Sequence, residues 1–157
     1  MSTFIGDFNG KADAKGRIVL PVAFKHELEN MGDMRLIVKK DLFEPCLLLY
    51  PYNEWERIMD DLRTKINSYD REHTRFLREY QRNTAELQVD NFSRILLPRR
   101  LLQIIGADKQ LTFLGVDKHI EVWDSDTYDS QAMSAEDLAL LAEKILGSNS
   151  RQNNETR

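Results

Sequence analysis

The sequence predicts an α+β protein in which two copies of one unit share a small β-barrel, with a helical hairpin inserted between them and a further helix near the C-terminal end. Three observations predict this class. A nine-residue motif occurs twice at a spacing of 77 residues, similar strand and helix patterns follow each copy, and the segment between the copies has helical periodicity.

The repeated motif reads D-x-x-x-R-I-x-L-P, with the copies DAKGRIVLP at 13–21 and DNFSRILLP at 90–98. Each proline precedes a short helical stretch, at 22–28 and at 99–105, and proline is favoured at a first helical position. Strands are expected next at 35–40 and 110–115, and then at 46–50 and 120–123. Because units of about 45 residues bury little apolar surface alone, the copies are expected to pair about a pseudo-two-fold axis.

The segment between the copies predicts two helices. Asn53 and Glu56 resemble a capping box. One face of the first helix is then formed by Trp55, Ile58, Met59, Leu62 and Ile66. Asp70 is expected to cap a second helix, with a less regular apolar face formed by Phe76, Leu77, Tyr80, Thr84 and Leu87.

Near the C-terminal end, Ser134 and Asp137 form another capping pattern, and Gly147 is expected to end this helix. Its apolar stripe (Leu138, Leu141 and Ile145) is expected to pack against its own domain. The polar stretch that follows is expected to be disordered. The predicted organisation is repeat 1 at 7–54, the helical insertion at 55–82, repeat 2 at 83–126, a C-terminal helical segment at 127–147 and the tail at 148–157.

Charge is unevenly distributed along the chain. The net charge is −4, with 22 basic and 26 acidic residues, but residues 1–40 carry +2 and residues 103–157 carry −5. A local basic surface is therefore compatible with an acidic protein. The single cysteine, Cys46, has apolar neighbours and is expected to be a buried thiol. With no apolar run near the ~20 residues of a membrane span, a cytoplasmic protein is expected.

The first motif contains groups suited to nucleic acid. Asp13 is expected to accept backbone N–H groups and to tighten the bend, and Gly16 permits a positive φ there. Arg17 would project from a rigid strand end and reach a phosphate or a guanine edge, while Lys11 and Lys15 neutralise phosphates. The alternative is a local Asp13–Arg17 ion pair. We favour the structural role for Asp13 and DNA contact for Arg17, since an exposed pair contributes only ~0–1 kcal/mol.

The second motif keeps Asp90 and Arg94 but has Asn91, Phe92 and Ser93 in the bend. Without glycine this bend is expected to be more restricted. Arg99 and Arg100 add positive charge after the proline. Copy one is therefore expected to be the principal DNA surface, and copy two a secondary or mainly structural one.

The paired motifs resemble two SpoVT-AbrB-type swapped-hairpin units, that is, an AbrB-like, double-split β-barrel. EPCLLLYPYNEWE (44–56), the helical insertion and HIEVWD (119–124) resemble the MraZ family of bacterial transcriptional regulators. The resemblance implies a cytoplasmic, nucleoid-associated protein that binds double-stranded DNA and regulates its own division and cell-wall gene cluster, usually as a repressor. It also implies a homo-oligomeric ring of eight or more subunits on short direct promoter repeats, with no cofactor and no metal.

Other functions remain open at this point. A ring-forming scaffold with little DNA affinity is the main alternative, and an antitoxin-like member of the same barrel class is another. An enzyme is disfavoured, because no phosphate-binding glycine loop or nucleophile elbow is present and His26, His73 and His119 have no metal-ligand spacing.

Overall fold

The chain was analysed as a computed structural model that describes residues 3–147. Its strands are β1 (Asp7–Lys11), β2 (Arg17–Val19), β3 (Arg35–Lys40), β4 (Leu47–Pro51), β5 (Thr84–Gln88), β6 (Arg94–Leu96), β7 (Gln110–Val116) and β8 (His119–Asp124). Its helices are α1 (Val22–Met31), α2 (Tyr52–Lys65), α3 (Arg71–Gln81), α4 (Arg99–Ile104), α5 (Ser125–Ser130) and α6 (Ala135–Ala142), and α6 continues into a π-helical turn (Glu143–Gly147). The mixed α+β class is confirmed.

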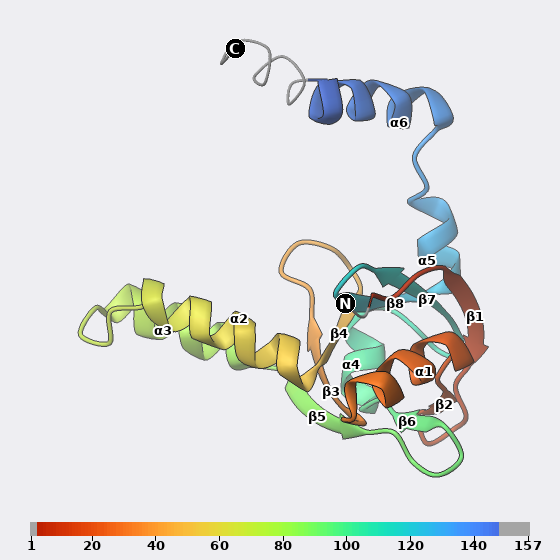
Figure 1. Cartoon of the computed structure of the whole chain (residues 1–157), viewed down its shortest axis with the longest axis horizontal. Coiled ribbons are helices and arrows are strands. Elements are labelled where there is room, and N and C mark those ends of the chain that lie inside the picture. Colours follow the sequence, from red (N-terminus) through yellow and green to blue (C-terminus); the bar gives the residue numbers. More distant parts are fainter. Residues whose placement is uncertain (1–2, 148–157) are drawn as a thin grey trace. The chain divides into compact units, whose positions relative to one another are not determined.

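The strands of the two repeats are interleaved. One sheet has the order β1-β7-β8-β4-β3-β5, with all neighbours antiparallel, and β2 pairs with β6 in a separate two-stranded ribbon. β1 of the first repeat thus pairs with β7 of the second, and β5 of the second pairs with β3 of the first. Each edge strand leads through a motif turn into the ribbon (Figure 1). Neither repeat can therefore complete its sheet alone.

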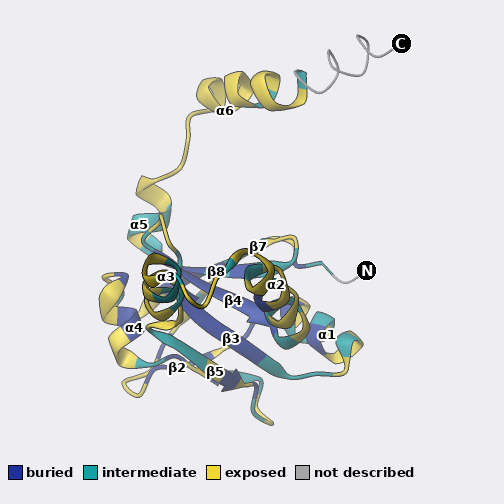
Figure 2. Ribbon diagram, turned by 90° about the vertical axis from the view of Figure 1, so that its left-hand side faces the viewer, coloured by how far each residue is buried: buried dark blue, intermediate teal, exposed yellow. Residues whose placement is uncertain are grey.

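The shared core lies between the sheet, the ribbon and helices α1 and α4. Ile18 and Ile95 face each other across the ribbon and are buried, as are Leu20 and Leu97 after them. Figure 2 shows that β3 and β4 are mostly buried, whereas the outer surfaces of α2 and α3 are exposed. Cys46 is fully buried, as expected, and burial raises the pKa of its thiol to about 12.

Several helix boundaries differ from the predictions. Pro21 and Pro98 are N-cap residues, one position before the first helical turn. Asn53 lies inside α2, whose N-cap is Pro51, so the predicted Asn53 cap is wrong. The Asp70 cap is confirmed, because its side chain accepts the N–H groups of Glu72 and His73.

The second apolar face was extended too far along the sequence. α3 ends at Gln81, and Thr84 and Leu87 belong to β5, where they pair with β3. Asn83, with a φ of 58°, marks the change of direction. Thr84 and Leu87 therefore continue the helical spacing of α3 only by coincidence, because they follow the bend at Asn83.

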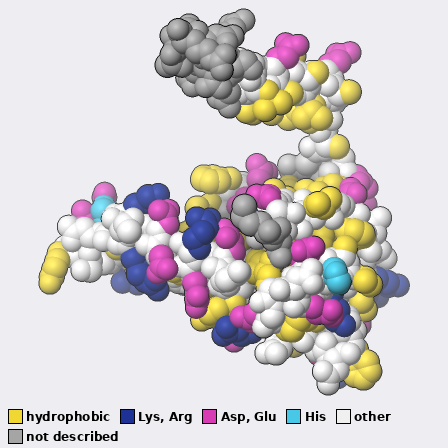
Figure 3. Space-filling model, in the orientation of Figure 1, with side chains coloured by type: hydrophobic (Ala, Val, Ile, Leu, Met, Phe, Trp, Pro, Cys, Tyr) yellow, Lys and Arg dark blue, Asp and Glu magenta, His cyan; other side chains and the backbone are white. Residues whose placement is uncertain are grey.

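The described residues divide into two compact units, with the boundary between Asp126 and Thr127. In the second unit, the side chain of Ser134 caps α6 by accepting the N–H of Asp137, as predicted. Figure 3 shows hydrophobic side chains along α6, and Leu138, Leu141 and Ile145 are exposed. The expected packing of this stripe is therefore not found among the described residues of the unit, which end at Gly147. The predicted disordered tail lies outside the described residues.

Candidate nucleic-acid interface

The first motif turn is held by one carboxylate. Oδ1 of Asp13 accepts the backbone N–H groups of Lys15 and Arg17, both at 2.9 Å, and Oδ2 accepts Nε–H of Arg17 at 2.6 Å. The N–H of Gly16 donates to the Asp13 carbonyl at 3.0 Å. The Asp13–Arg17 ion pair is therefore present. It also fixes the direction of the Arg17 side chain, so the ion pair and a contact of Arg17 with DNA are compatible.

Gly16 meets two requirements of this turn. Its φ is +89°, which favours glycine, and a Cβ there would overlap the carbonyl oxygen of Leu97. The Gly16 carbonyl accepts the N–H of Leu97 at 2.9 Å, so the first turn rests directly on the end of β6. The motif glycine is therefore needed for close approach between the two repeats.

The second turn repeats this geometry. Asp90 accepts the N–H groups of Phe92 at 2.8 Å and Arg94 at 2.9 Å, and Nε–H of Arg94 at 3.0 Å. Ser93 adopts a φ of +63°, and its carbonyl accepts the N–H of Leu20 at 2.8 Å. Ser93 thus adopts the left-handed conformation that Gly16 adopts in the first turn, and the hydrogen bonds to Asp90 hold it there.

Hydrogen bonding keeps both carboxylates charged. The pKa of Asp13 lies below its ordinary value, mainly because the backbone N–H of Arg17 stabilises the ionised form, and the Arg17 side chain adds to this. The pKa of Asp90 is lowered in the same way by the backbone N–H of Arg94. At neutral pH each turn therefore contains a fixed carboxylate–guanidinium pair.

The ribbon brings the two motif arginines to one outward face. Arg17 pairs with Leu96 and Arg94 with Val19, whereas Ile18 and Ile95 point into the core. On such a ribbon the two arginines are diagonal neighbours, a relation with Cα separations of about 7–8 Å. Their side chains are 39% and 33% exposed, and the aspartates engage Nε, so the outer edge of each guanidinium is available to a ligand.

The remaining predicted contacts take different places. Lys15 is exposed at the tip of the first turn, and Lys11 lines a shallow groove with Val19 and Val22. The guanidinium of Arg99 donates to the carbonyl of Ala14, across 85 residues of sequence. Arg99 thus fixes the first turn from the other repeat, a role that sequence reasoning missed because no local pattern encodes it. Arg100 follows it and is exposed.

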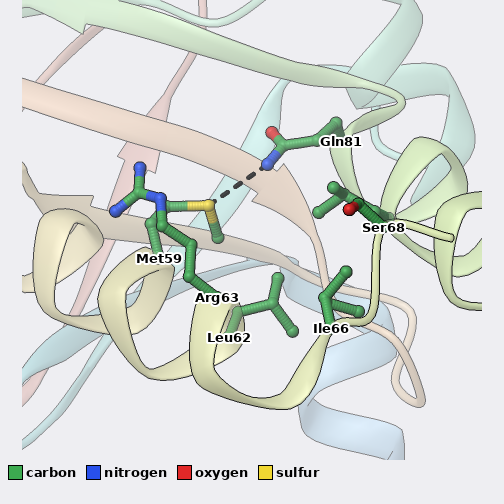
Figure 4. Close-up of a pocket in the computed structure, with 7 residues that line it drawn as sticks. Met59, Leu62, Arg63, Ile66, Ser68 and Gln81 are labelled. Carbon is green, nitrogen blue, oxygen red and sulfur yellow. Dashed lines mark hydrogen bonds between the residues drawn. The ribbon is translucent and has the colours of Figure 1, made fainter.

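A second concave surface lies between α2 and α3 (Figure 4). It is lined by Met59, Leu62, Arg63, Ile66, Ser68, Leu77 and Gln81. Nε2–H of Gln81 donates to Sδ of Met59 at 3.2 Å, which joins the two helices. The lining is mainly apolar and its one cation, Arg63, pairs with Asp60 at 2.6 Å. This surface is less suited to a polyanion than the ribbon.

The histidines and acidic residues of the described part of the chain form no metal site. Within residues 3–147, no group of three or more His, Cys, Asp or Glu side chains is arranged to hold a metal ion. His73 instead accepts the backbone N–H of Asn67 at 2.9 Å, and the ring of His119 lies 5.5 Å from that of Tyr50. Among these residues no helix has the length and apolar composition needed to cross a bilayer.

Comparison with known proteins gives a consistent result. The model of the MraZ protein family matches residues 3–79 and 81–145. Proteins named transcriptional regulator MraZ from Bacteroides thetaiotaomicron and Bacteroides fragilis are each 34% identical, over 99% and 98% of both chains. A protein of the same name from Pseudomonas putida is 36% identical over 82% of this chain and 83% of its own length.

Proposed function

This chain belongs to the MraZ family, and we propose from that premise that it is a sequence-specific DNA-binding transcriptional regulator with an AbrB-like double-split barrel. It binds short direct repeats in the promoter of its own division and cell-wall gene cluster, mainly as a repressor. It acts as a ring of several copies in the cytoplasm, at the nucleoid. The outward face with Arg17 and Arg94 is the observation on which this proposal depends.

The geometry of the ribbon suits recognition of a duplex. Each arginine is fixed through Nε, so binding costs little side-chain entropy. The free edge of a guanidinium can contact a phosphate or the O6 and N7 atoms of guanine. A two-stranded ribbon is also narrow enough to enter a major groove about 12 Å wide.

A ring accounts for binding by an acidic chain. The net charge of −4 opposes long-range attraction to DNA, and one ribbon offers few phosphate contacts. When several copies engage neighbouring repeats, effective concentration raises overall affinity by roughly 10²–10⁴-fold. Repeats about 10–10.5 bp apart would present the same groove face to each copy.

The direct test is replacement of Arg17 by Ala. We expect Arg17→Ala to abolish the electrophoretic shift of promoter DNA while size-exclusion elution stays native, because the side chain contributes no core contact. Arg17→Lys should restore only part of the affinity, since ammonium lacks the planar fork. Arg63→Ala removes an exposed, ion-paired arginine from α2 and serves as the matched control.

The scaffold alternative predicts the opposite result. A ring that binds other proteins would keep its elution volume and show no DNA affinity that depends on Arg17. Native affinity in Arg17→Ala would therefore move the DNA site away from the ribbon, and absence of binding by the native chain would favour the scaffold.

A further inference from the structure

The two ends of the β2–β6 ribbon differ chemically although their backbones are equivalent. Residues of the second repeat correspond to those of the first at a spacing of 77, so Lys15 corresponds to Phe92 and Val22 to Arg99. We name the end with Lys15, Arg99 and Arg100 the charged end. The end with Phe92, Val22 and Ala23 is the apolar end.

At the charged end, the basic side chains that replace apolar residues of the other end suit a phosphate. Lys15 is exposed at the turn tip, and Arg99 reaches the turn through the Ala14 carbonyl. Lys109 and Asp108 border the groove beside this turn and balance each other in charge. The tip of this turn is therefore positively charged and suited to phosphate contacts, which do not distinguish one base from another.

At the apolar end, a large hydrophobic side chain takes the place of the lysine. Phe92 is 74% exposed at the turn tip, and Val22, at the start of α1, is 80% exposed. Leu20 joins this start of α1 to the turn through its bond to Ser93. The nearby cation on α1, Lys25, pairs with Glu29 at 3.7 Å. Figure 3 shows hydrophobic surface at the loop between β5 and β6.

The Phe92 ring lies beside a motif arginine. Its backbone N–H donates to Asp90, and the guanidinium carbon of Arg94 lies 5.0 Å from the ring centre. The turn does not need this side chain in order to fold, since Lys15 occupies the same position in the first repeat. Single exposed apolar residues are common on protein surfaces, but Phe92 shares its end of the ribbon with the exposed Val22 and lies beside the motif arginine Arg94, on the surface that is proposed to bind DNA. This position, rather than its exposure, favours a role in binding.

We propose that Phe92 is a specificity residue that contacts the 5-methyl group of a thymine in the major groove, while the charged end binds phosphates. This inference rests on the proposed DNA-binding function. Apolar side chains recognise thymine through this methyl group, which the other bases of DNA lack. Arg17 and Arg94, common to both ends, hold the ribbon against the duplex between them.

The test begins with duplexes that the native full-length chain selects from random DNA. The affinity of the native chain is then measured with each thymine of the selected site replaced in turn by deoxyuridine, which lacks only the methyl group. At one position we expect a loss of about fivefold. Phe92→Ala should lose a similar factor on the thymine site and nothing more on the deoxyuridine site.

Three further variants complete the design. Phe43→Ala removes another exposed phenylalanine, on the loop between β3 and β4 away from the ribbon, and should bind as the native chain does (Figure 1). Lys15→Ala should weaken selected and random duplexes equally. Phe92→Lys should raise the magnitude of the salt slope by about one phosphate contact and reduce sequence preference. Unchanged thermal unfolding of Phe92→Ala verifies its fold.

The outcomes separate this inference from the proposed function. If the native chain selects no sequence, the proposed function fails. If it selects a sequence but tolerates deoxyuridine at every position, or if Phe92→Ala binds like the native chain, the assignment of Phe92 alone is overturned.

Discussion

At the scale of single residues, the motif aspartates connect folding to ligand binding. Asp13 receives three hydrogen bonds from its own turn, and one of them orients Arg17. Asp90 does the same for Arg94. The geometry that the two turns share therefore depends on the charge of two carboxylates at the protein surface.

The depressed pKa values predict loss of stability in acid. Above the ordinary Asp pKa of 3.8 the carboxylates are ionised in both folded and unfolded chains, so this contribution is fully present. As the pH falls below that value, the unfolded chain takes up protons first, and stability decreases until the folded carboxylates are protonated as well. Asp13→Asn should flatten this decrease, because the amide cannot titrate.

Chemical unfolding between about pH 5 and pH 2 measures this effect. Asp60→Asn, which removes an exposed carboxylate of α2, is the control. A native chain whose unfolding midpoint falls no more steeply in acid than that of Asp13→Asn would contradict the role of the Asp13 carboxylate.

Sequence reasoning identified these residues because the chemistry is local. Asp13, Gly16 and Arg17 lie within five positions, so the turn can be derived from residue types alone. It did not show that Ser93 would adopt the same left-handed conformation as Gly16, which costs serine about 1–2 kcal/mol, a cost that the Asp90 hydrogen bonds offset. It also missed the Arg99–Ala14 contact, since two positions 85 residues apart share no pattern.

At the scale of elements, the α2–α3 hairpin is joined to the sheet by aromatic rings. The rings of Trp55 and Tyr80 stack with centroids 6.3 Å apart, and Nζ of Lys39, from β3, lies 3.6 Å from the centre of the Tyr80 ring. Lys39 is 3% exposed, and burial lowers the pKa of its ammonium group. The Tyr80 ring is thus a close partner of this buried cation.

Replacement of Tyr80 by Ala should therefore destabilise the protein by about 2 kcal/mol, through lost stacking and a cation left without its ring. Tyr80→Phe keeps the ring and should change the free energy of unfolding by less than about 0.5 kcal/mol. Tyr69→Ala, at the exposed hairpin tip, is the matched control. Urea unfolding measures all three, and equal losses in Tyr80→Ala and Tyr69→Ala would refute this role.

Helix existence was predictable here, and helix boundaries were less so. The spacing of the apolar residues Trp55, Met59 and Leu62 predicted α2, because these residues lie on the one face of the helix that packs against the rest of the protein. Asn53 was misassigned as a cap, because the chain already turns into the helix at Pro51. Lys39 gave no signal, since an isolated lysine in a strand looks like an exposed residue until the ring above it is known.

At the scale of the whole molecule, the interleaved strands explain why the two repeats form a single folded unit. β2 and β6 come from different repeats, and their pairing places Arg17 and Arg94 on a single face. The repeat itself was visible in the sequence, and the small size of each half predicted that the two copies share one barrel, but the order of the strands in the sheet could not be derived from the spacing. The uneven distribution of charge along the sequence indicated that an acidic chain could have a basic surface, but it did not predict where in the fold that surface lies.

The dependence of DNA affinity on salt tests the central claim most directly. We predict that the affinity of the native chain for its selected duplex falls with salt, with a log–log slope of about −0.9 for each phosphate contact. The residual binding of the double variant Arg17→Gln, Arg94→Gln, measured by titration in solution at low salt, should have a slope smaller in magnitude by up to about two contacts for each engaged copy. The oligomer should elute unchanged. Identical slopes for the native chain and the double variant would contradict a ribbon that binds DNA through its paired arginines.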